Sequence, residues 1–453
     1  MHPNPVDPDQ SLRRLPDGTI RQVSPLTGTV VWTVPGRSNR PFRSMVPPAR
    51  GLSEGERDSS CAFCPRRYLE TPPERSRLVL DADATEARGS TAREPWRILR
   101  HVPAEQLDDT VAEYRRVPNL FEILTYDYWH ANHGYEIPAQ VDARAHEYVR
   151  TPAGREHVLA IMRTRLQAAG ATPEQVADEP EARLLERSLS LFASTHDVVI
   201  ARRHFIDGAT CDDELASCAD LTPLEHDAYL ALALDTLRCL DRANPFARYV
   251  AVFQNWLRPA GASFDHLHKQ FVAIDEYGPQ LEREIELLSG DCELFNTVVA
   301  DPAARARLVI AENDHALALA GVGHRYPTVE VYSTGQVNLP WEHDASQRRG
   351  VSDLLHACHA ATGRLVATNE EWHYRPVGSR VPMPWRINLK WRVSTLAGFE
   401  GGTRINVNTI DPFTLRERMV AELHRLRTSG RIAAMSIGDE CTHRLGALGY
   451  ARG

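Results

Sequence analysis

The chain has 453 residues, which is more than one hydrophobic core usually covers, so two or three domains are expected. Hydrophobic residues make up 42% and charged residues 25%, as in globular proteins, and no apolar run approaches the ~20 residues that span a bilayer. Acidic residues outnumber basic ones, and the net charge of −8 disfavours binding to nucleic acid or to an acidic membrane. A small binding module and a membrane protein are thus excluded, and any bound phosphate must be held by a local site.

The N-terminal segment is polar and rich in proline, and it lacks the apolar stretch of a signal peptide. We predict a disordered lead over residues 1–18 and a cytoplasmic protein, whose eight cysteines are mostly thiols. Residues 20–42 alternate apolar and turn residues, which predicts two short strands around the turn at 25–28. A loop that carries Arg37 and Arg40 follows these strands.

Cys61 and Cys64 are the one cysteine pair with the spacing of metal ligands. A CxxC pair can be half of a zinc site, a redox pair or a chance occurrence. Because no second CxxC exists to complete a four-thiolate site, the other ligands of a zinc ion would be histidines, of which the chain has 19. The pair by itself leaves these alternatives open.

The middle of the chain alternates between helical and strand patterns. Residues from about 140 to 190 have helical spacing and many charges, which predicts an inserted helical pair with an exposed outer face. Residues 194–201 are typical of a strand that ends near His204. Thr222 and Glu225 match a capping box that opens a helix to about residue 242. Strands are expected at 248–255 and 266–274.

Residues 281–430 show the same strand-rich pattern and are predicted to form a second half. Its main strand candidates are residues 307–318, 328–332 and 385–394. Asp411 and Pro412 predict the start of a last helix that ends near residue 427. Residues 431–453 form a C-terminal tail in this division, and residues 19–280 form the N-terminal half.

The segment His266-Leu-His-Lys-Gln270 carries the chemistry. On a strand, His266, His268 and Gln270 would project from one face, and Leu267 and Lys269 from the other. One imidazole can ligate a metal while its neighbour acts as a nucleophile or base, although a structural pair of histidines is the alternative. Neutral imidazole can attack phosphorus at physiological pH and then leave again.

Neutral donors surround this segment in the sequence. Ser263 offers a hydroxyl in a glycine-containing turn, Asn255 ends the preceding strand, and Gln270 can donate to a non-bridging phosphate oxygen. These residues favour nucleotidyl or phosphoryl transfer over proteolysis or redox chemistry. No serine hydrolase elbow, P-loop or dinucleotide fingerprint competes with this interpretation.

These motifs resemble the galactose-1-phosphate uridylyltransferases, a branch of the histidine-triad superfamily whose active-site motif is HPHGQ. The segment from 24 to 42, SPLTGTVVWTVPGRSNRPF, is similar to the family's N-terminal signature, and Cys61-Ala-Phe-Cys64-Pro is similar to its zinc-binding region. Pro118-Asn-Leu-Phe121 resembles the segment that contacts the nucleoside. The likeness is clear over about 20–125 and 194–275 and weaker from 276 to 428.

The resemblance implies an α+β fold of two histidine-triad-like halves with antiparallel sheets, plus the helical insertion. It implies a structural Zn²⁺ site formed by Cys61, Cys64, His204 and His266, with His196 as a rival to His204. His268 would be the nucleophile, and Gln270, Ser263 and Asn255 would hold the α-phosphate. Arg37 and Arg40 occupy phosphate-binding positions, and Asn119 would face the base or ribose.

The sequence also departs from the family pattern. Leu267 and Lys269 replace the proline and glycine of the motif, which predicts a less flexible and more charged loop. In the second half, residues 384–390 stand where many members carry an HxH strand for another metal, so that second metal site is expected to be absent. Thr409 lies nearest the family's sugar-contacting glutamine, which leaves the identity of the sugar open.

The expected function is therefore transfer of a nucleoside monophosphate between a nucleotide sugar and a sugar 1-phosphate. UMP is the nucleotide that the resemblance favours. The protein would act in carbohydrate metabolism as a homodimer. It would bind neither nucleic acid nor a membrane. One alternative is a phosphorylase or hydrolase of ADP-sugars or dinucleoside polyphosphates that uses the same histidine. Another is a catalytically silent zinc protein that binds nucleotides.

Overall fold

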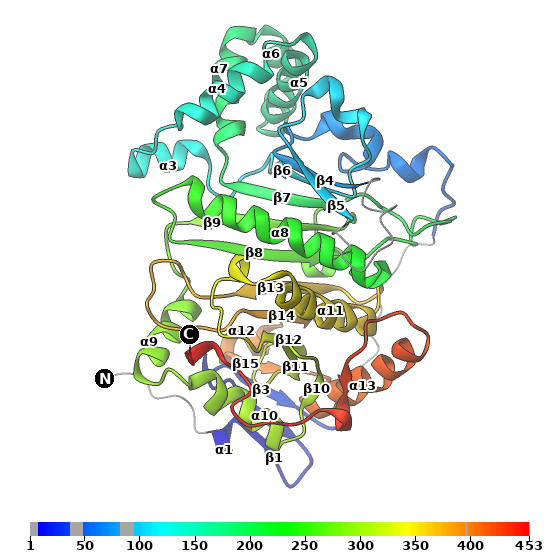
Figure 1. Cartoon of the computed structure of the whole chain (residues 1–453), viewed down its shortest axis with the longest axis vertical. Coiled ribbons are helices and arrows are strands. Elements are labelled where there is room, and N and C mark those ends of the chain that lie inside the picture. Colours follow the sequence, from blue (N-terminus) through cyan, green and yellow to red (C-terminus); the bar gives the residue numbers. More distant parts are fainter. Residues whose placement is uncertain (1–7, 37–48, 82–94, 395–396, 453) are drawn as a thin grey trace.

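The computed structural model describes residues 8–36, 49–81, 95–394 and 397–452. Its centre is a twelve-stranded sheet in which every neighbouring pair of strands is antiparallel, in the order β16-β10-β11-β12-β14-β13-β8-β9-β7-β6-β4-β5 (Figure 1). The first half of the chain supplies β4 (Ser76–Leu80), β5 (Trp96–Arg100), β6 (Tyr114–Pro118), β7 (His196–Ala201), β8 (Tyr249–Trp256) and β9 (His268–Ile274). The second half supplies β10 (Val309–Glu312), β11 (Ala316–Ala320), β12 (Thr328–Ser333), β13 (Thr368–His373), β14 (Arg386–Trp391) and β16 (Ser436–Ile437).

The two halves meet where β8 pairs with β13, with Asn255 opposite Asn369. From this junction the strands run outward as β8-β9-β7-β6-β4 on one side and as β13-β14-β12-β11-β10 on the other. A long helix precedes the junction strand in each half, α8 (Pro223–Ala243) before β8 and α11 (Ala345–Thr362) before β13. The structure thus confirms the predicted α+β fold, and β14 occupies in the second half the place that β9 has in the first.

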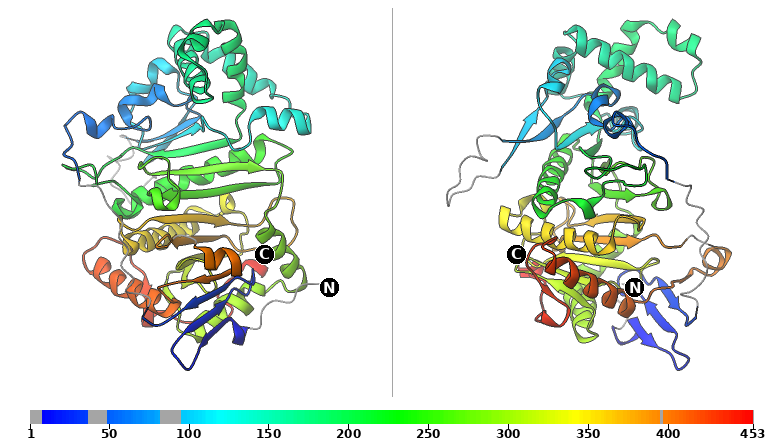
Figure 2. Two further views of the ribbon diagram at one scale, coloured as in Figure 1. Left: turned by 180° about the vertical axis from the view of Figure 1, so that it is seen from behind. Right: turned by 90° about the vertical axis from the view of Figure 1, so that its right-hand side faces the viewer.

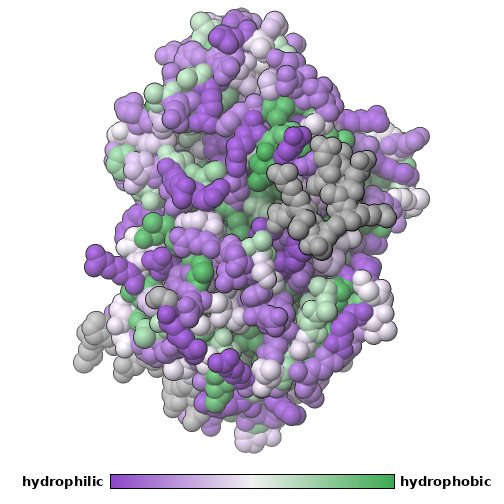
Figure 3. Space-filling view, in the orientation of Figure 1, coloured by the Kyte–Doolittle hydropathy of each residue, from purple (hydrophilic) through white to green (hydrophobic). Residues whose placement is uncertain are grey.

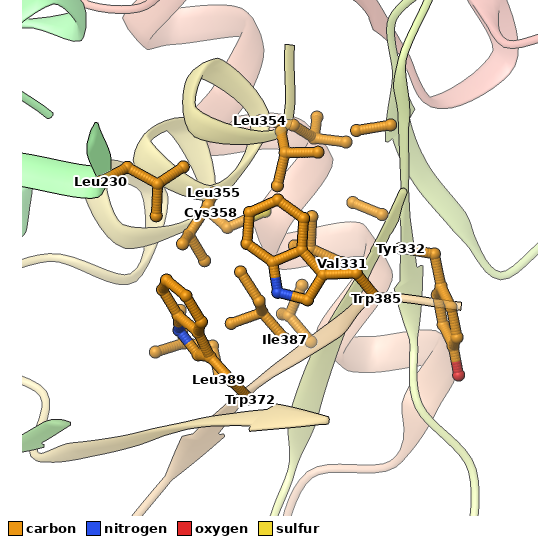
Figure 4. Packing of buried hydrophobic residues seen from close by; sticks show 14 of the residues in the cluster. Leu230, Val331, Tyr332, Leu354, Leu355, Cys358, Trp372, Trp385, Ile387 and Leu389 are labelled. Atoms are coloured by element: carbon orange, nitrogen blue, oxygen red, sulfur yellow. The ribbon is translucent and has the colours of Figure 1, made fainter. Parts of the chain in front are cut away.

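Helices cover one face of the sheet. The α8 helix packs on β6 to β9, while α11 and α13 (Pro412–Thr428) pack on the strands of the second half (Figures 1 and 2). Figure 4 shows the indole rings of Trp372 and Trp385 beneath Leu354 and Leu355 of α11, all of them buried. The opposite face of the first half carries His268 and Gln270 on β9.

Side-chain caps explain where these helices begin. Thr222 and Asp411 each accept backbone N–H groups at the starts of α8 and α13, which confirms both predicted starts. Asp344 forms a capping box at the start of α11, a helix that the sequence analysis missed. The predicted strand 307–318 is instead the hairpin of β10 and β11, because residues 313–315 turn between them.

A second, smaller sheet lies beside the second half and has the order β1-β2-β3-β15 (Figure 2). It contains β1 (Leu12–Arg14), β2 (Ile20–Val23), β3 (Val30–Thr33) and β15 (Ile405–Val407), the last parallel to β3. The predicted strands on either side of the turn at 25–28 are therefore confirmed. The prediction of a disordered lead is wrong for α1 (Pro8–Ser11) and β1, because β1 pairs with β2 and Leu12 packs against the core.

The inserted region contains more helices than the predicted pair. After α3 (Tyr126–His133) it comprises α4 (Ala139–Tyr148), α5 (Pro152–Ala168), α6 (Pro173–Asp178) and α7 (Glu181–Ala193). A separate small core holds them together, formed by Val158, Leu159, Ile161, Met162, Leu184 and Leu191. Over the described ranges, no helix is both long and apolar enough to cross a membrane.

The remaining helices link the halves or close the ends of the chain. They are α9 (Pro279–Gly290), α10 (Asp301–Arg305) and α12 (Gly398–Thr403). The C-terminal tail is part of the core, because Leu448 and Tyr450 are fully buried and the Phe295 N–H donates to the Tyr450 hydroxyl oxygen at 3.0 Å.

Glu122, which links the sheet to the insertion, should make stability depend on pH. Burial raises the pKa of its carboxyl to about 7, although Arg165 lies 3.6 Å away. Because the folded pKa exceeds the unfolded one, the stability that Glu122 contributes is present below pH ~4.5 and is lost as pH rises through 7. Glu122→Gln should therefore raise the free energy of unfolding by about 2–3 kcal/mol at pH 8 and by little at pH 4.

Urea unfolding at several pH values measures this effect. Glu186→Gln, a change at an exposed position of α7, is the matched control and should leave the pH profile unaltered. An equal gain for Glu122→Gln at pH 4 and pH 8 would contradict the assignment.

Candidate active site

Two cysteines and two histidines from distant parts of the chain meet at one point. The ligand atoms of Cys61, Cys64, His204 and His266 all lie within 4.8 Å of one another. Cys61 Sγ is 3.8 Å from Cys64 Sγ, 3.5 Å from His204 Nδ1 and 3.4 Å from His266 Nδ1. The four residues that the family resemblance implied as ligands are thus brought together.

The donor set and its geometry fit a tetrahedral zinc ion. With Zn–S near 2.3 Å and Zn–N near 2.0–2.1 Å, neighbouring ligand atoms would be about 3.3–3.8 Å apart. The Cys64 Sγ distances of 3.3 Å to His204 Nδ1 and 3.9 Å to His266 Nδ1 bracket this range. His266 Nε2 lies 2.6 Å from the Ala201 carbonyl oxygen and donates to it, which leaves Nδ1 unprotonated for a metal.

Phe63, between the two cysteines, connects this cluster to His268. Its ring centroid lies 5.3 Å from that of His268 and 4.5 Å from that of Phe264. A hydrogen bond between the Cys64 N–H and the Cys61 carbonyl closes the turn that presents Phe63. The sequence analysis missed this residue, and an aromatic side chain inside the CxxC was its only signal.

His268 is the first residue of β9 and is 5% exposed. The prediction that the strand begins at His266 is wrong, because His266 turns toward the cysteines before the ladder starts. His268 Nδ1 lies 2.6 Å from the His266 carbonyl oxygen and donates to it, so the lone pair is on Nε2. Burial lowers the pKa of His268 to about 4, which favours the neutral ring.

Gln270 and Asn119 contact His196, which lies outside the cysteine cluster. The Ile123 N–H donates to His196 Nδ1 at 3.2 Å, so the ring proton is on Nε2 and is donated to Gln270 Oε1 at 3.2 Å. This contact leaves the Gln270 amide N–H groups available to a ligand. Asn119 Nδ2 lies 3.0 Å from His196 Nε2. Of the two rival histidines, His204 is therefore the one with metal-ligand geometry.

Of the other predicted phosphate ligands, the two that the structure describes, Asn255 and Ser263, form no hydrogen bond with the side chain of His268 or Gln270. Asn255 lies on β8, two residues beyond the Phe253 that pairs with Gln270, and its Oδ1 accepts a hydrogen bond from Asn369 at 2.7 Å. Ser263 is exposed in the turn before the motif. Arg37 and Arg40 lie outside the described residues.

Lys269 of the motif is buried on the face opposite His268. Its ammonium pairs with Glu370 of β13 and lies 5.3 Å from the ring of Tyr229 on α8. Burial opposes ionisation of Glu370, but the charge of Lys269 outweighs it and holds the pKa of this carboxyl below its usual range. The lysine therefore joins the two halves of the sheet, and the expectation of a charged loop is wrong because residue 269 is in a strand.

This ion pair gives a prediction about stability. Lys269→Met leaves a buried carboxylate that only His359 and Trp372 still hydrogen-bond, and should cost about 3–5 kcal/mol in the free energy of unfolding. Adding Glu370→Gln should recover part of that loss, because the unpaired charge is gone. Urea denaturation of both single variants and the double variant measures the coupling. Additive losses would contradict a direct ion pair.

In the second half, β14 holds an arginine where β9 holds His268. Asn388 pairs with Glu371 and Glu330, as Gln270 pairs with Phe253 and Val198, so Arg386 corresponds to His268. Arg386 is buried and donates to Glu284 at 2.9 Å. The stretch 384–390 thus places a cation, rather than an imidazole, at this position.

The comparisons with known proteins agree with this architecture. The fold is similar to that of an ADP-glucose phosphorylase from Arabidopsis thaliana, with a TM-score of 0.53 and 18% identity over 88% of this chain and 97% of that one. It is also similar to a GalT-like protein from the same plant, with a TM-score of 0.51 and 18% identity over 80% and 92% of the two chains. The predicted family resemblance is thereby confirmed as a likeness of fold.

Two sequence comparisons complete these findings. A search of curated proteins found no match. The sequence model of a family described as domain of unknown function (DUF4921) matches residues 15–450. The match extends over both halves of the sheet and the insertion.

Proposed function

The chain belongs to the DUF4921 family, and we propose that it is an enzyme that transfers a nucleoside monophosphate through a covalent nucleotidyl-His268 intermediate. The observation that carries the proposal is the hydrogen bond from His268 Nδ1 to the His266 carbonyl, because it leaves the Nε2 lone pair for attack. The buried, neutral ring is also a good leaving group in the return step.

Both half-reactions take place at the α-phosphorus of the donor. His268 Nε2 attacks this phosphorus, the bond to the bridging oxygen breaks, and a sugar 1-phosphate leaves with that oxygen and its electron pair. An acceptor phosphate oxygen then attacks the same phosphorus, and the phosphorus–nitrogen bond breaks. Nε2 regains its lone pair, and the nucleotide leaves on the acceptor.

The surrounding residues would hold the transferred group. The Gln270 amide, oriented by His196, would donate to a non-bridging oxygen, and Ser263 and Asn255 would add further donors. Arg37 and Arg40 would neutralise phosphate charge. Asn119 would face the base or ribose, and Phe121, which is 57% exposed, offers a ring beside it.

A zinc ion held by Cys61, Cys64, His204 and His266 would hold the loop of the two cysteines against the motif segment that begins at His266. Its role would be structural, because all four ligand positions come from protein side chains. His266 would then both ligate the metal and accept from His268 Nδ1, which positions the nucleophile. A homodimer and a cytoplasmic location belong to the same proposal and rest on the sequence resemblance.

The proposed reaction moves UMP between a nucleotide sugar and a sugar 1-phosphate. A second candidate is phosphorolysis of an ADP-sugar, with inorganic phosphate as the acceptor. The similarity to an ADP-glucose phosphorylase over most of both chains supports this second candidate.

A matrix of donors and acceptors tests the proposal. UDP-glucose and ADP-glucose are each incubated with the enzyme and with glucose 1-phosphate, galactose 1-phosphate, inorganic phosphate or no acceptor. Turnover that needs a sugar 1-phosphate supports the transferase, and turnover that needs phosphate supports the phosphorylase. Absence of nucleotide transfer in every combination would contradict the proposed function.

A further inference from the structure

A cavity of about 720 Å³ lies between the inserted helices and the sheet. Its walls come from α4, α7, the ends of β5 and β6, and the C-terminal end of α8, and we call it the insertion cavity. The helices that form its roof are labelled at the top of Figure 1. None of the described residues assigned above to the candidate active site lines it.

The insertion cavity and His268 lie on opposite faces of the sheet. The Tyr114 hydroxyl donates to a backbone oxygen of α8, so Tyr114 and Arg116, two residues apart on β6, both face that helix. Lys269 also faces α8, and its neighbour His268 therefore faces away. A ligand in the cavity would thus occupy a second site.

The lining of the cavity is strongly basic in a chain of net charge −8. Three glutamates face six arginines, and one of them, Glu74, is already paired with Arg77 at 2.8 Å. Asp197 is shared between Arg75 at 3.2 Å and Arg116 at 2.6 Å, and Arg100 donates to Asp235 at 2.7 Å. Arg144, Arg150 and Arg242 are therefore the lining arginines that form no ion pair with a carboxylate among the described residues. The six lining arginines are Arg75, Arg100, Arg116, Arg144, Arg150 and Arg242. On the face of the molecule that Figure 3 shows, hydrophilic residues predominate.

One contact in the cavity joins an arginine to a histidine. Arg144 of α4 donates to His101 Nε2 at 2.7 Å, so this histidine must be neutral. Burial and the charges of Arg144, Arg75, Arg100 and Arg116 lower the pKa of His101 to about 4. His101 also has the left-handed φ of 55°, a conformation that few non-glycine residues adopt.

We propose that the insertion cavity binds a phosphorylated small molecule. Its volume is that of a site for a nucleotide-sized or sugar-phosphate-sized ligand. Planar guanidinium groups match phosphate oxygens in pairs of hydrogen bonds. Tyr135, Tyr148 and Phe192 add an aromatic part of the wall for the organic portion of the ligand.

Inorganic pyrophosphate is the probe for this site. Arg144→Gln with Arg242→Gln removes one cation from α4 and one from α8, and Arg183→Gln, at an exposed position of α7 outside the cavity lining, is the control. Isothermal titration of the full chain should show one binding event in the wild type and the control that weakens at least tenfold in the double variant. Equal titrations for all three proteins would overturn the proposal.

Cys239 reports on the cavity directly, because it lines the wall near the C-terminal end of α8. Pyrophosphate should slow its alkylation by iodoacetamide in the wild type, measured on the Cys239 peptide by mass spectrometry. This readout needs no variant, so it holds even where the double variant fails to fold. Unchanged alkylation of Cys239 at saturating pyrophosphate, or protection only by a single-stranded oligonucleotide, would overturn the proposal.

Discussion

His268→Ala is expected to lower kcat by at least about 10⁴-fold, because it removes the nucleophile of the proposed covalent intermediate. The substitution removes the ring whose Nε2 carries the lone pair and changes none of the four residues of the cysteine and histidine cluster. Steady-state turnover with the best donor and acceptor pair measures the effect. Nucleotide affinity should change much less than kcat, since Gln270, Asn255 and Asn119 remain.

His146→Ala is the matched control, since this histidine is exposed on α4 and should tolerate the change. Its kcat should equal that of the wild type. Retention of more than a tenth of wild-type turnover by His268→Ala would contradict a nucleophilic role. That result would instead favour direct transfer between the two substrates or a nucleotide-binding protein without catalysis.

Cys64→Ser is expected to cause a large loss of stability together with the loss of the metal. Cys64 is fully buried, and its Sγ contacts Cys61, His204 and His266. Loss of one thiolate should release the zinc and cost on the order of 3–5 kcal/mol in the free energy of unfolding, because metal binding is coupled to folding. Zinc content by mass spectrometry and urea denaturation measure the two effects.

Turnover should fall together with the zinc content. His266 would lose its anchor, and its carbonyl oxygen fixes the ring of His268. Cys292→Ser provides the control, because Cys292 is exposed and lies outside the cluster. A Cys64→Ser protein that keeps one zinc per chain and wild-type stability would contradict the assignment of these ligands.

Helix caps and the alternation of apolar and polar residues are signals that lie within a single element, and they predicted several helices and strands. The caps at Thr222 and Asp411 gave the starts of α8 and α13, and alternation gave β2, β3 and β8. The motif predicted that His268 and Gln270 lie on one face of their strand, because successive side chains of a strand alternate between its faces. Such features depend on neighbours within a few residues.

Features that depend on distant contacts could not be predicted in this way. The role of Lys269 follows from Glu370, which is 101 residues away, and nothing near the motif indicates that partner. The choice between His196 and His204 stayed open in the sequence, because both flank the same strand. Only the three-dimensional arrangement separates a metal ligand from the residue that orients Gln270.

The pairing of the lead with the smaller sheet has the same explanation. Residues 12–14 form a strand of only three residues, two of them arginines, and this strand forms because β2 provides a partner. The number of inserted helices depended on breaks at 149–151 and 169–172, which the charged pattern obscured.

Trapping of the covalent intermediate tests the central claim most directly. The wild-type protein is incubated with UDP-glucose or ADP-glucose without an acceptor, and its peptides are analysed by mass spectrometry. We expect a nucleoside monophosphate on the peptide that contains His268, and we expect its loss when the acceptor found in the donor and acceptor matrix is added. A protein that turns over these substrates without ever carrying the nucleotide on His268 would contradict the account.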